Sequence, residues 1–247
     1  SSALMSVIPA KIAGVKNIVV CSPKIRPEVI VAADLAGATK IFNVGGVQAI
    51  AALAYGTKQI PKVDKIVGPG NKFVTEAKKQ VFGGTGIDFI AGPSEILIIT
   101  DDTTNKEFIK ADLEAQKEHD KDAKIWVLKT NDAQIEQTIK KANEIAPEHL
   151  ELFVKKPQEY INKLKNYGSL FIGESSGVVF GDYCSGTNHI LPTNRAARYT
   201  GGLSMKDFIK LQTYQKIKPN KKLIRATMRL AKIEGLEKHR ISAELRL

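Results

Sequence analysis

Four histidines, His119, His149, His189 and His239, are the residues of this chain best suited to chemistry. An imidazole titrates near neutral pH and binds metals, so it serves acid–base catalysis and metal ligation alike. A lone histidine is more often a surface residue or a satisfied core residue. Each of these four has a polar neighbour with a chemical use, so the neighbours decide between the two interpretations.

Glu148 and His149 are adjacent and follow Pro147, where a predicted helix gives way to a predicted strand. A carboxylate beside an imidazole is the combination that general acid–base catalysis requires. The pair therefore predicts proton transfer at the start of a strand.

Two further patterns offer metal ligands. Gln116 and His119 are three residues apart on a predicted helix and share a face. Asp182 and His189 flank a polar loop, 181–189, and loops at the carboxyl ends of strands are the usual ligand-binding places of α/β proteins. Four side chains could together supply nitrogen and oxygen ligands to a zinc ion: Gln116, His119, Asp182 and His239. The spacing alone leaves ordinary surface residues as the alternative.

Glycines at 45–46 and 68–70 each lie between a predicted strand and a predicted helix. Backbone N–H groups at such a helix start can bind a phosphate. The sequence has neither GxGxxG nor GxxxxGK[ST], and the spacing by itself favours simple turns.

The elements that must position these residues alternate between aliphatic runs and helical patterns, which is typical of a parallel sheet with helical crossovers. The predicted strands are 17–21, 40–44, 65–67, 87–90, 95–100, 124–128, 150–154 and 169–172. The predicted helices between them are 27–35, 47–55, 72–81, 104–119, 132–145 and 158–165.

The chain changes in character after Gly202, where helices rich in Lys and Arg are predicted at 204–214, 220–233 and 235–246. Ser204 is a good N-cap, with Asp207 in the position that completes a capping box. The predicted domains are 1–93, 94–203 and 204–247. The last is too short for a core of its own, so we expect it to pack on a neighbour or a partner subunit.

The 247 residues are 43% hydrophobic, which is globular, and carry a formal net charge of +11. Such a charge can indicate nucleic-acid binding, but the lysines are scattered and no aromatic cluster accompanies them, so a solvated surface is favoured. No apolar run approaches the ~20 residues that span a bilayer. Two distant cysteines exclude a disulfide scaffold and fit a reducing cytoplasm.

Eight segments along nearly the whole chain closely resemble the histidinol dehydrogenase family. They are IPAKIAGVKNIVVCSP, FNVGGVQAIAALAYGT, KIVGPGNKFVTEAKKQVFG, IDFIAGPSEILII, EAQKEHD, PEHLEL, GDYCSGTNHILPT and EGLEKH. The resemblance implies two Rossmann-like parallel-sheet α/β units and a short helical tail. Family members also carry an N-terminal segment before the point that matches Ser1, and the second unit would be incomplete without it.

The resemblance also implies a role for each site residue. It makes Glu148 and His149 the acid–base pair. The implied zinc ligands, with one zinc per subunit, are Gln116, His119, Asp182 and His239. Those ligands and His149 also bind substrate, together with Ser94, His189 and Glu234. The implied NAD contacts are Gln48 and Asn71, and both lie in the first predicted domain, 1–93, which would bind NAD.

The implied reaction is the oxidation of L-histidinol to L-histidine through L-histidinaldehyde, with two hydride transfers to NAD. The family is a homodimer whose tail crosses to the partner's site, so Glu234 and His239 would act in trans. The alternative is a truncated, non-catalytic homologue that binds zinc and an imidazole ligand. A basic nucleic-acid binder is the third hypothesis, and it rests on the net charge alone.

Overall fold

The computed structural model of the chain describes residues 1–119 and 121–247, with the side chain at 119 outside the described part. The chain divides into two compact units, Ser1–Ile209 and Lys210–Leu247, and each is described by itself. The predicted domain boundaries stay predictions.

A four-stranded parallel sheet forms the larger core of the first unit. Its strands lie in the order β6-β5-β7-β8. Their bounds are β5 (Glu95–Thr100), β6 (Lys124–Lys129), β7 (His149–Phe153) and β8 (Ser169–Ile172). Every residue of β5 and β7 is buried. Strands buried on both faces are expected of a parallel sheet covered by helices on each side.

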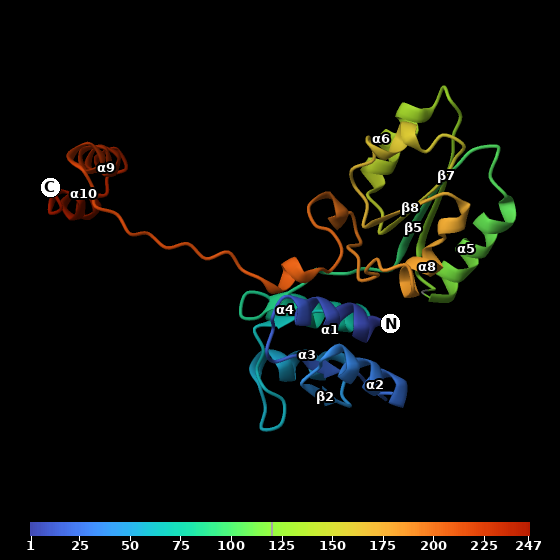
Figure 1. Cartoon of the computed structure of the whole chain (residues 1–247), viewed down its shortest axis with the longest axis horizontal. Coiled ribbons are helices and arrows are strands. Elements are labelled where there is room, and N and C mark those ends of the chain that lie inside the picture. The colour runs from blue at the N-terminus through green and yellow to red at the C-terminus, as the bar shows by residue number, and fades with distance from the viewer. Residues whose placement is uncertain (120) are drawn as a thin grey trace. The chain divides into compact units, whose positions relative to one another are not determined.

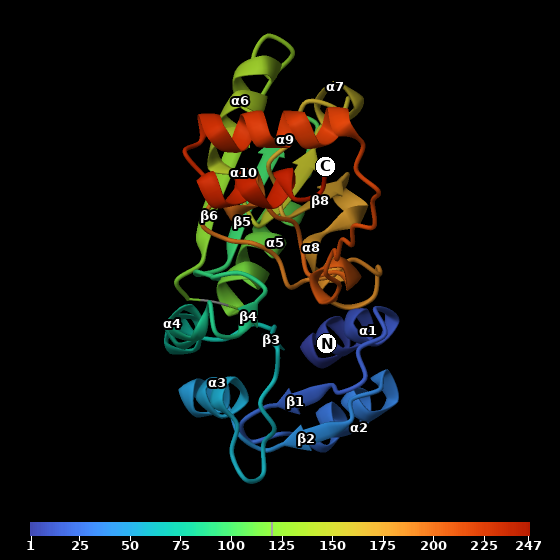
Figure 2. The same ribbon diagram turned by 90° about the vertical axis from the view of Figure 1, so that its left-hand side faces the viewer.

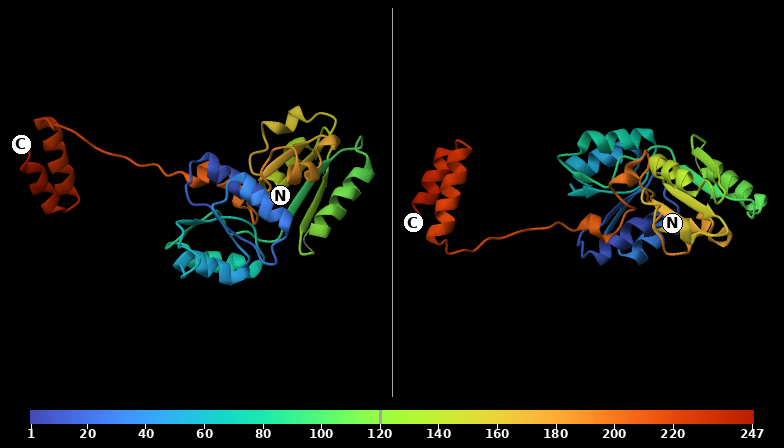
Figure 3. Two further views of the ribbon diagram at one scale, coloured as in Figure 1. Left: turned by 60° about the horizontal axis from the view of Figure 1, so that its bottom comes forward. Right: turned by 90° about the horizontal axis from the view of Figure 1, so that it is seen from above.

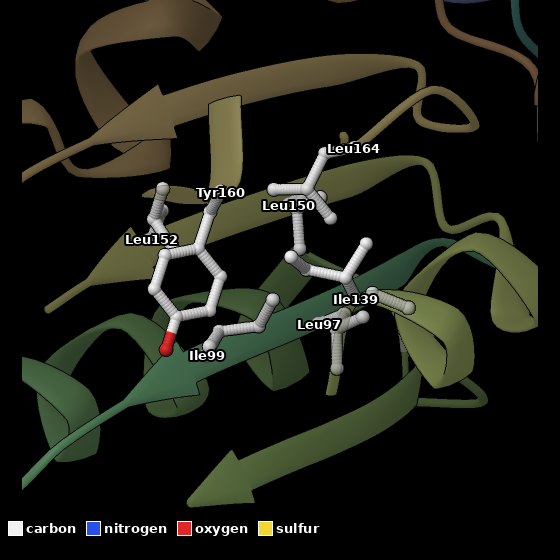
Figure 4. Packing of buried hydrophobic residues seen from close by; sticks show 8 residues of the cluster. Leu97, Ile99, Ile139, Leu150, Leu152, Tyr160 and Leu164 are labelled. Atoms are coloured by element: carbon white, nitrogen blue, oxygen red, sulfur yellow. The ribbon is translucent and has the colours of Figure 1, made fainter. Parts of the chain in front are cut away.

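Helices cover the two faces of this sheet. One face packs against α6 (Ile135–Ile145) and α7 (Gln158–Ile161), with Leu97 and Leu150 from the central strands in the cluster that Figure 4 shows. The opposite face packs against α5 (Lys106–His119) and α8 (Val178–Tyr183). Figure 1 shows α5 and α6 on opposite sides of the sheet. The result is a three-layer α/β arrangement.

The amino-terminal part contains two smaller parallel sheets. Strand β1 (Val19–Cys21) pairs with β2 (Lys40–Phe42), and β3 (Lys65–Ile66) pairs with β4 (Gly86–Ile87). Figure 2 shows β1 and β2 side by side. The helices here are α2 (Pro27–Ala36), α3 (Gly46–Tyr55) and α4 (Lys72–Val81). The predicted α/β class with parallel strands is confirmed, whereas the division into two Rossmann-like units stays a prediction.

Some elements were absent from the sequence prediction. Helix α1 (Ser2–Ile12) packs Val7 and Ala10 beside Ile18. Helix α8 and three short 3₁₀ turns were also not predicted. The turns are η1 (Glu174–Ser176), η2 (Ala196–Arg198) and η3 (Met205–Phe208).

The predicted helix at 204–214 is wrong, because only the turn η3 forms there. The capping contact exists, since the Ser204 backbone N–H donates to Asp207 Oδ2 over 2.8 Å. The residues after it bury little apolar surface, since Leu211 and Tyr214 are each 94% exposed. A cap alone cannot extend a helix that buries no apolar face.

The second unit is a helical pair, α9 (Lys221–Ile233) and α10 (Glu237–Glu244), which agrees with the last two predicted helices. The two helices pack against each other, and both views of Figure 3 show them side by side. Among the described residues, no helix is long and apolar enough to cross a membrane.

Candidate active site

The adjacent strands β5 and β7 bring the predicted acid–base residues together at their amino ends. Ser94 immediately precedes β5, and Glu148 immediately precedes β7. Because the two strands are parallel, with Ile96 opposite His149, their first residues meet at one edge of the sheet. The loop between 184 and 195 reaches the same edge, where Asn194 N–H donates to Glu95 Oε1 over 3.1 Å.

This position corrects one expectation from the sequence. Ligand sites of open α/β sheets usually lie at the carboxyl ends of the strands. Here the polar loop after α8 returns to the amino ends of β5 and β7, so Ser94, Glu148 and His149 lie at the opposite edge.

A chain of hydrogen bonds holds the Glu148 carboxyl group. Gln116 Nε2 donates to Ser94 Oγ over 2.6 Å, and Ser94 Oγ donates to Glu148 Oε2 over 2.9 Å. The backbone N–H of Glu95 donates to the same Glu148 oxygen over 2.9 Å. The sequence placed these residues in separate motifs, and the structure links them directly.

Burial raises the pKa of the Glu148 carboxyl group above its ordinary value. The neighbouring His149 and the hydrogen bonds from Glu95 and Ser94 act in the opposite direction, and burial outweighs them. A carboxyl group whose pKa is raised in this way can exchange protons closer to neutral pH, which suits an acid–base catalyst.

The His149 ring is held in one orientation. Its Nδ1 lies 3.0 Å from the backbone oxygen of Glu95 and 3.5 Å from Glu148 Oε2. A carbonyl oxygen can only accept, so Nδ1 is the protonated nitrogen and Nε2 carries the lone pair of the neutral ring. Nε2 is buried, with no hydrogen-bond partner among the described residues. A buried nitrogen without a partner is rare in folded proteins, and this one is available to accept a hydrogen bond or a proton.

The predicted metal ligands are divided among three places. Gln116 on α5 is buried, Asp182 on α8 is half-buried, and the two helices are in contact. The side chain of His119 is outside the described part, and His239 belongs to the second unit. The described side chains contain no metal-binding group of three or more His, Cys, Asp or Glu. Gln116 and Asp182 thus lie on adjacent helices, and the full set of four stays a prediction.

His189 is fixed by bonds to two other elements. Its Nδ1 donates to the backbone oxygen of Asp182 over 2.9 Å, which leaves Nε2 to accept from Ser2 Oγ over 3.0 Å. Asn188 Nδ2 also donates to the Met5 backbone oxygen over 2.8 Å. Helix α1, which was not predicted, therefore anchors the loop that carries His189. Glu234 lies outside this unit, between α9 and α10.

The two predicted cofactor residues follow β2 and β3, which belong to separate sheets of the amino-terminal part. Gln48 is exposed in the first turn of α3, which follows β2. Asn71 caps α4, which follows β3, and its Oδ1 accepts from Phe73 N and Val74 N. A Cβ at Gly70 would lie 2.4 Å from the Val74 side chain, so this turn requires a glycine. The roles of Gln48 and Asn71 toward a cofactor stay predictions.

A buried ion pair behind the second glycine turn was not found in the sequence. Lys78 of α4 bonds to Asp88, and their side chains are only 4% and 1% exposed. Lys78 Nζ donates to the Gly68 backbone oxygen over 3.0 Å, and the Gly68 N–H donates to Asp88 Oδ2 over 2.8 Å. The available signal was a lysine in line with Val74 and Val81 on the apolar face of the helix.

The site and the fold together define an α/β protein with a buried Glu–His pair arranged for proton transfer. The family model described as histidinol dehydrogenase matches residues 1–141 and 132–247. The chain belongs to the histidinol dehydrogenase family. Membership implies an oxidoreductase of histidine biosynthesis.

Individual relatives agree with this result. Histidinol dehydrogenase of Methanocaldococcus jannaschii is 43% identical over 288 residues, covering 100% of this chain and 67% of that protein. The enzyme of Thermococcus kodakarensis is 44% identical over 268 residues, covering 100% of this chain and 71% of that protein. The crystal structure of histidinol dehydrogenase from Elizabethkingia anophelis has a TM-score of 0.87 and 38% identity, covering 99% of this chain and 66% of that chain. The chain thus spans about two thirds of these relatives.

The matches also show an internal difference that the sequence reading missed. The 247 residues of this chain align across 288 positions of the Methanocaldococcus relative, which therefore has residues without a counterpart here. The two family-model segments both include 132–141, which lies in the connection between β6 and β7.

Proposed function

We propose that this chain is a zinc-dependent, NAD-linked histidinol dehydrogenase that oxidises L-histidinol to L-histidine through L-histidinaldehyde. One observation carries the proposal. The buried Nε2 of His149 has no partner among the described residues, and the ring is held in the tautomer that leaves this nitrogen basic.

His149 serves as the base of the first oxidation. Its Nε2 accepts the hydroxyl proton of the substrate while the carbon gives up a hydride, and the product is the aldehyde. The Glu95 carbonyl keeps the ring oriented and stabilises the imidazolium that forms. Bound NAD supplies the hydride acceptor.

Glu148 serves in the second oxidation. Its carboxylate accepts a proton from the water that adds to the aldehyde, which gives the anion of the hydrate. This anion becomes the carboxylic acid when its carbon gives up the second hydride, for which a second NAD would be the acceptor. Ser94 and the backbone N–H of Glu95 hold Glu148 Oε2 in place for this transfer. Its raised pKa keeps the proton exchange within reach of neutral pH.

The donor set of Gln116, His119, Asp182 and His239 fits zinc, which accepts imidazole nitrogens and side-chain oxygens. Two of these residues lie on the adjacent helices α5 and α8. Zinc bound there would orient the substrate through its imidazole and amine. We assign NAD to the glycine turns with Gln48 and Asn71, where the start of α3 has no side-chain cap and can offer backbone N–H groups to a phosphate.

We assign the second unit to a partner subunit's site in a homodimer. It consists of two short helices, and Leu230 and Ile233 are 61% and 76% exposed on α9. A pair of helices of this size cannot bury its apolar residues by itself. Glu234 and His239 would then act in trans. The two cysteines are free, which suits the reducing cytoplasm to which we assign the protein.

The test is formation of NADH from L-histidinol by the purified chain, with added zinc and with a chelator-treated sample as the control. Turnover that the chelator abolishes and zinc restores supports the proposal. Zinc-dependent binding of histidinol in a calorimeter without any NADH would contradict it, and would favour the non-catalytic homologue.

A further inference from the structure

A pair of carboxyl groups, Asp112 and Glu151, lies further along the sheet from the acid–base residues, away from the amino ends of β5 and β7. Glu151 is on β7, two residues after His149, and is 0% exposed. Asp112 is on α5, one helical turn before Gln116, and its carboxyl group packs against Gly177, next to Val178, whose backbone N–H donates to Glu151. No step of the proposed reaction uses either residue.

The surroundings of Glu151 are apolar apart from this partner. Its neighbours in register are Ile98 on β5 and Phe171 on β8, and both belong to the cluster that includes Val178. Among the described groups, Asp112 is the one whose charge acts on Glu151. An ionised Glu151 could not remain beside an ionised Asp112 in such a place, because the buried Glu151 carboxylate would lack a counter-charge.

The hydrogen bonds of Glu151 are complete only when the pair holds a proton. The backbone N–H of Val178 donates to Glu151 Oε1 over 3.1 Å. Glu151 Oε2 is buried and finds no donor among the described residues. A proton on Glu151 turns this carboxyl group into a donor toward Asp112, so both groups gain a partner.

We propose that Asp112 and Glu151 share one proton and form a positioning pair, which fixes α5 and the start of α8 against β7. This role rests on the function proposed above, because these three elements carry Gln116, Asp182 and His149. The pair touches neither substrate nor cofactor and acts through the elements that it joins. A Cβ at Gly177 would lie 3.3 Å from Asp112 Oδ1, so Asp112 also packs against the turn that starts α8.

The charge state of the pair depends on pH in a defined direction. Burial, together with the charge of Asp112, raises the pKa of Glu151 from 4.5 to about 8. Between these two values the folded protein keeps a proton that the unfolded chain has released. Stability from this group is therefore full at low pH and is lost as the pH rises toward about 8.

The first test is the melting temperature of the full chain and of Glu151→Gln as a function of pH. Glutamine keeps an oxygen for Val178 and an N–H for Asp112, so it imitates the protonated state at every pH. We expect the melting temperature of the variant, relative to that of the wild type, to rise by about 5 °C or more from about pH 6 to pH 9. Glu114→Gln, an exposed change on the same helix, should show no such gain. A constant difference between Glu151→Gln and the wild type would overturn the shared proton.

The second test reads the site itself, which a purely structural role would not move. The ring signals of the four histidines are followed by NMR against pH, and His149→Asn identifies the His149 signal. In the wild type this signal should shift near the pH at which Glu151 ionises, and in Glu151→Gln that shift should be absent. An identical shift in both proteins would overturn the positioning role.

Asp112→Asn keeps the test open if Glu151→Gln fails to fold. Asp112 is one cause of the raised pKa of Glu151, so the transition should move to lower pH, and an unmoved transition would overturn the pair. Neither readout needs turnover. If both tests succeed but the chain makes no NADH, the carboxyl pair is supported and the proposed function is contradicted.

Discussion

His149 donates a hydrogen bond from Nδ1 to the backbone oxygen of Glu95, the first residue of the neighbouring strand, over 3.0 Å. The acceptor is a backbone atom of a buried strand, so its position does not depend on a rotamer. This bond fixes both the tautomer and the direction of the ring. The same strand start also holds Glu148 through the Glu95 N–H, so one residue positions both members of the acid–base pair.

Ser94→Ala should shift the pH dependence of turnover. The Ser94 hydroxyl lowers the pKa of Glu148, in opposition to burial, so its removal should raise that pKa further. The acidic limb of the rate profile should then move to higher pH, with a stability loss of about 1 kcal/mol. Steady-state rates between pH 5 and pH 9 measure the shift. The same change made in Glu148→Gln should produce no shift, and a shift there would contradict the assignment of the limb to Glu148.

Glu148→Gln should separate the two oxidations. The amide cannot take a proton from water, so oxidation of the aldehyde should slow by about 100-fold or more, while the first hydride transfer is affected less. The measurement is the number of NADH formed per histidinol in a single-turnover experiment. The wild type should form two, and the variant should stop near one. Two NADH at an unchanged rate would refute the role given to Glu148.

Lys78→Met should weaken both the fold and cofactor binding. The change leaves the Asp88 carboxylate buried without its counter-charge, which costs about 3 kcal/mol or more of the free energy of unfolding. The Gly68 turn loses its bond to Lys78, so the KM for NAD should rise. Lys79→Met is the matched control, because Lys79 is 62% exposed and should change stability by less than about 0.5 kcal/mol. Equal effects of the two changes would contradict the account of this turn.

Exchange of the tail between subunits can be tested by mixing two inactive variants. His149→Asn removes the base from the first unit, and His239→Ala removes a proposed zinc ligand from the second unit. If the tail acts in trans, each mixed dimer contains one site with both residues intact, so refolding the two together should restore about a quarter of wild-type activity. No recovery in mixed dimers would show that each tail serves its own subunit.

The sequence predicted best where local signals and packing agree. Helix α4 spans 72–81 as predicted, because Asn71 caps it and an apolar face packs beside α3. Strands β5 and β8 also have their predicted bounds, since each is a short apolar run between turns. The helix predicted at 204–214 had a cap but no surface to bury, and it does not form.

The arrangement of the site was less predictable. Motif resemblance indicated Ser94, Gln116 and Glu148, but not that they form one hydrogen-bonded chain, because that depends on which strands are neighbours. The edge of the sheet at which they meet was also opposite to the general expectation. Buried charges such as Lys78 and Glu151 interrupt apolar patterns, and a single sequence does not indicate which partner compensates each of them.

The most direct test of the acid–base assignment is the rate of the first NADH formed from L-histidinol by His149→Asn, with zinc content measured on the same sample. Asparagine keeps an N–H near the Glu95 carbonyl but offers no basic nitrogen. We predict a rate at least about 100-fold below that of the wild type, with unchanged zinc content and melting temperature. A variant with wild-type zinc content and a wild-type rate would show that His149 is not the base.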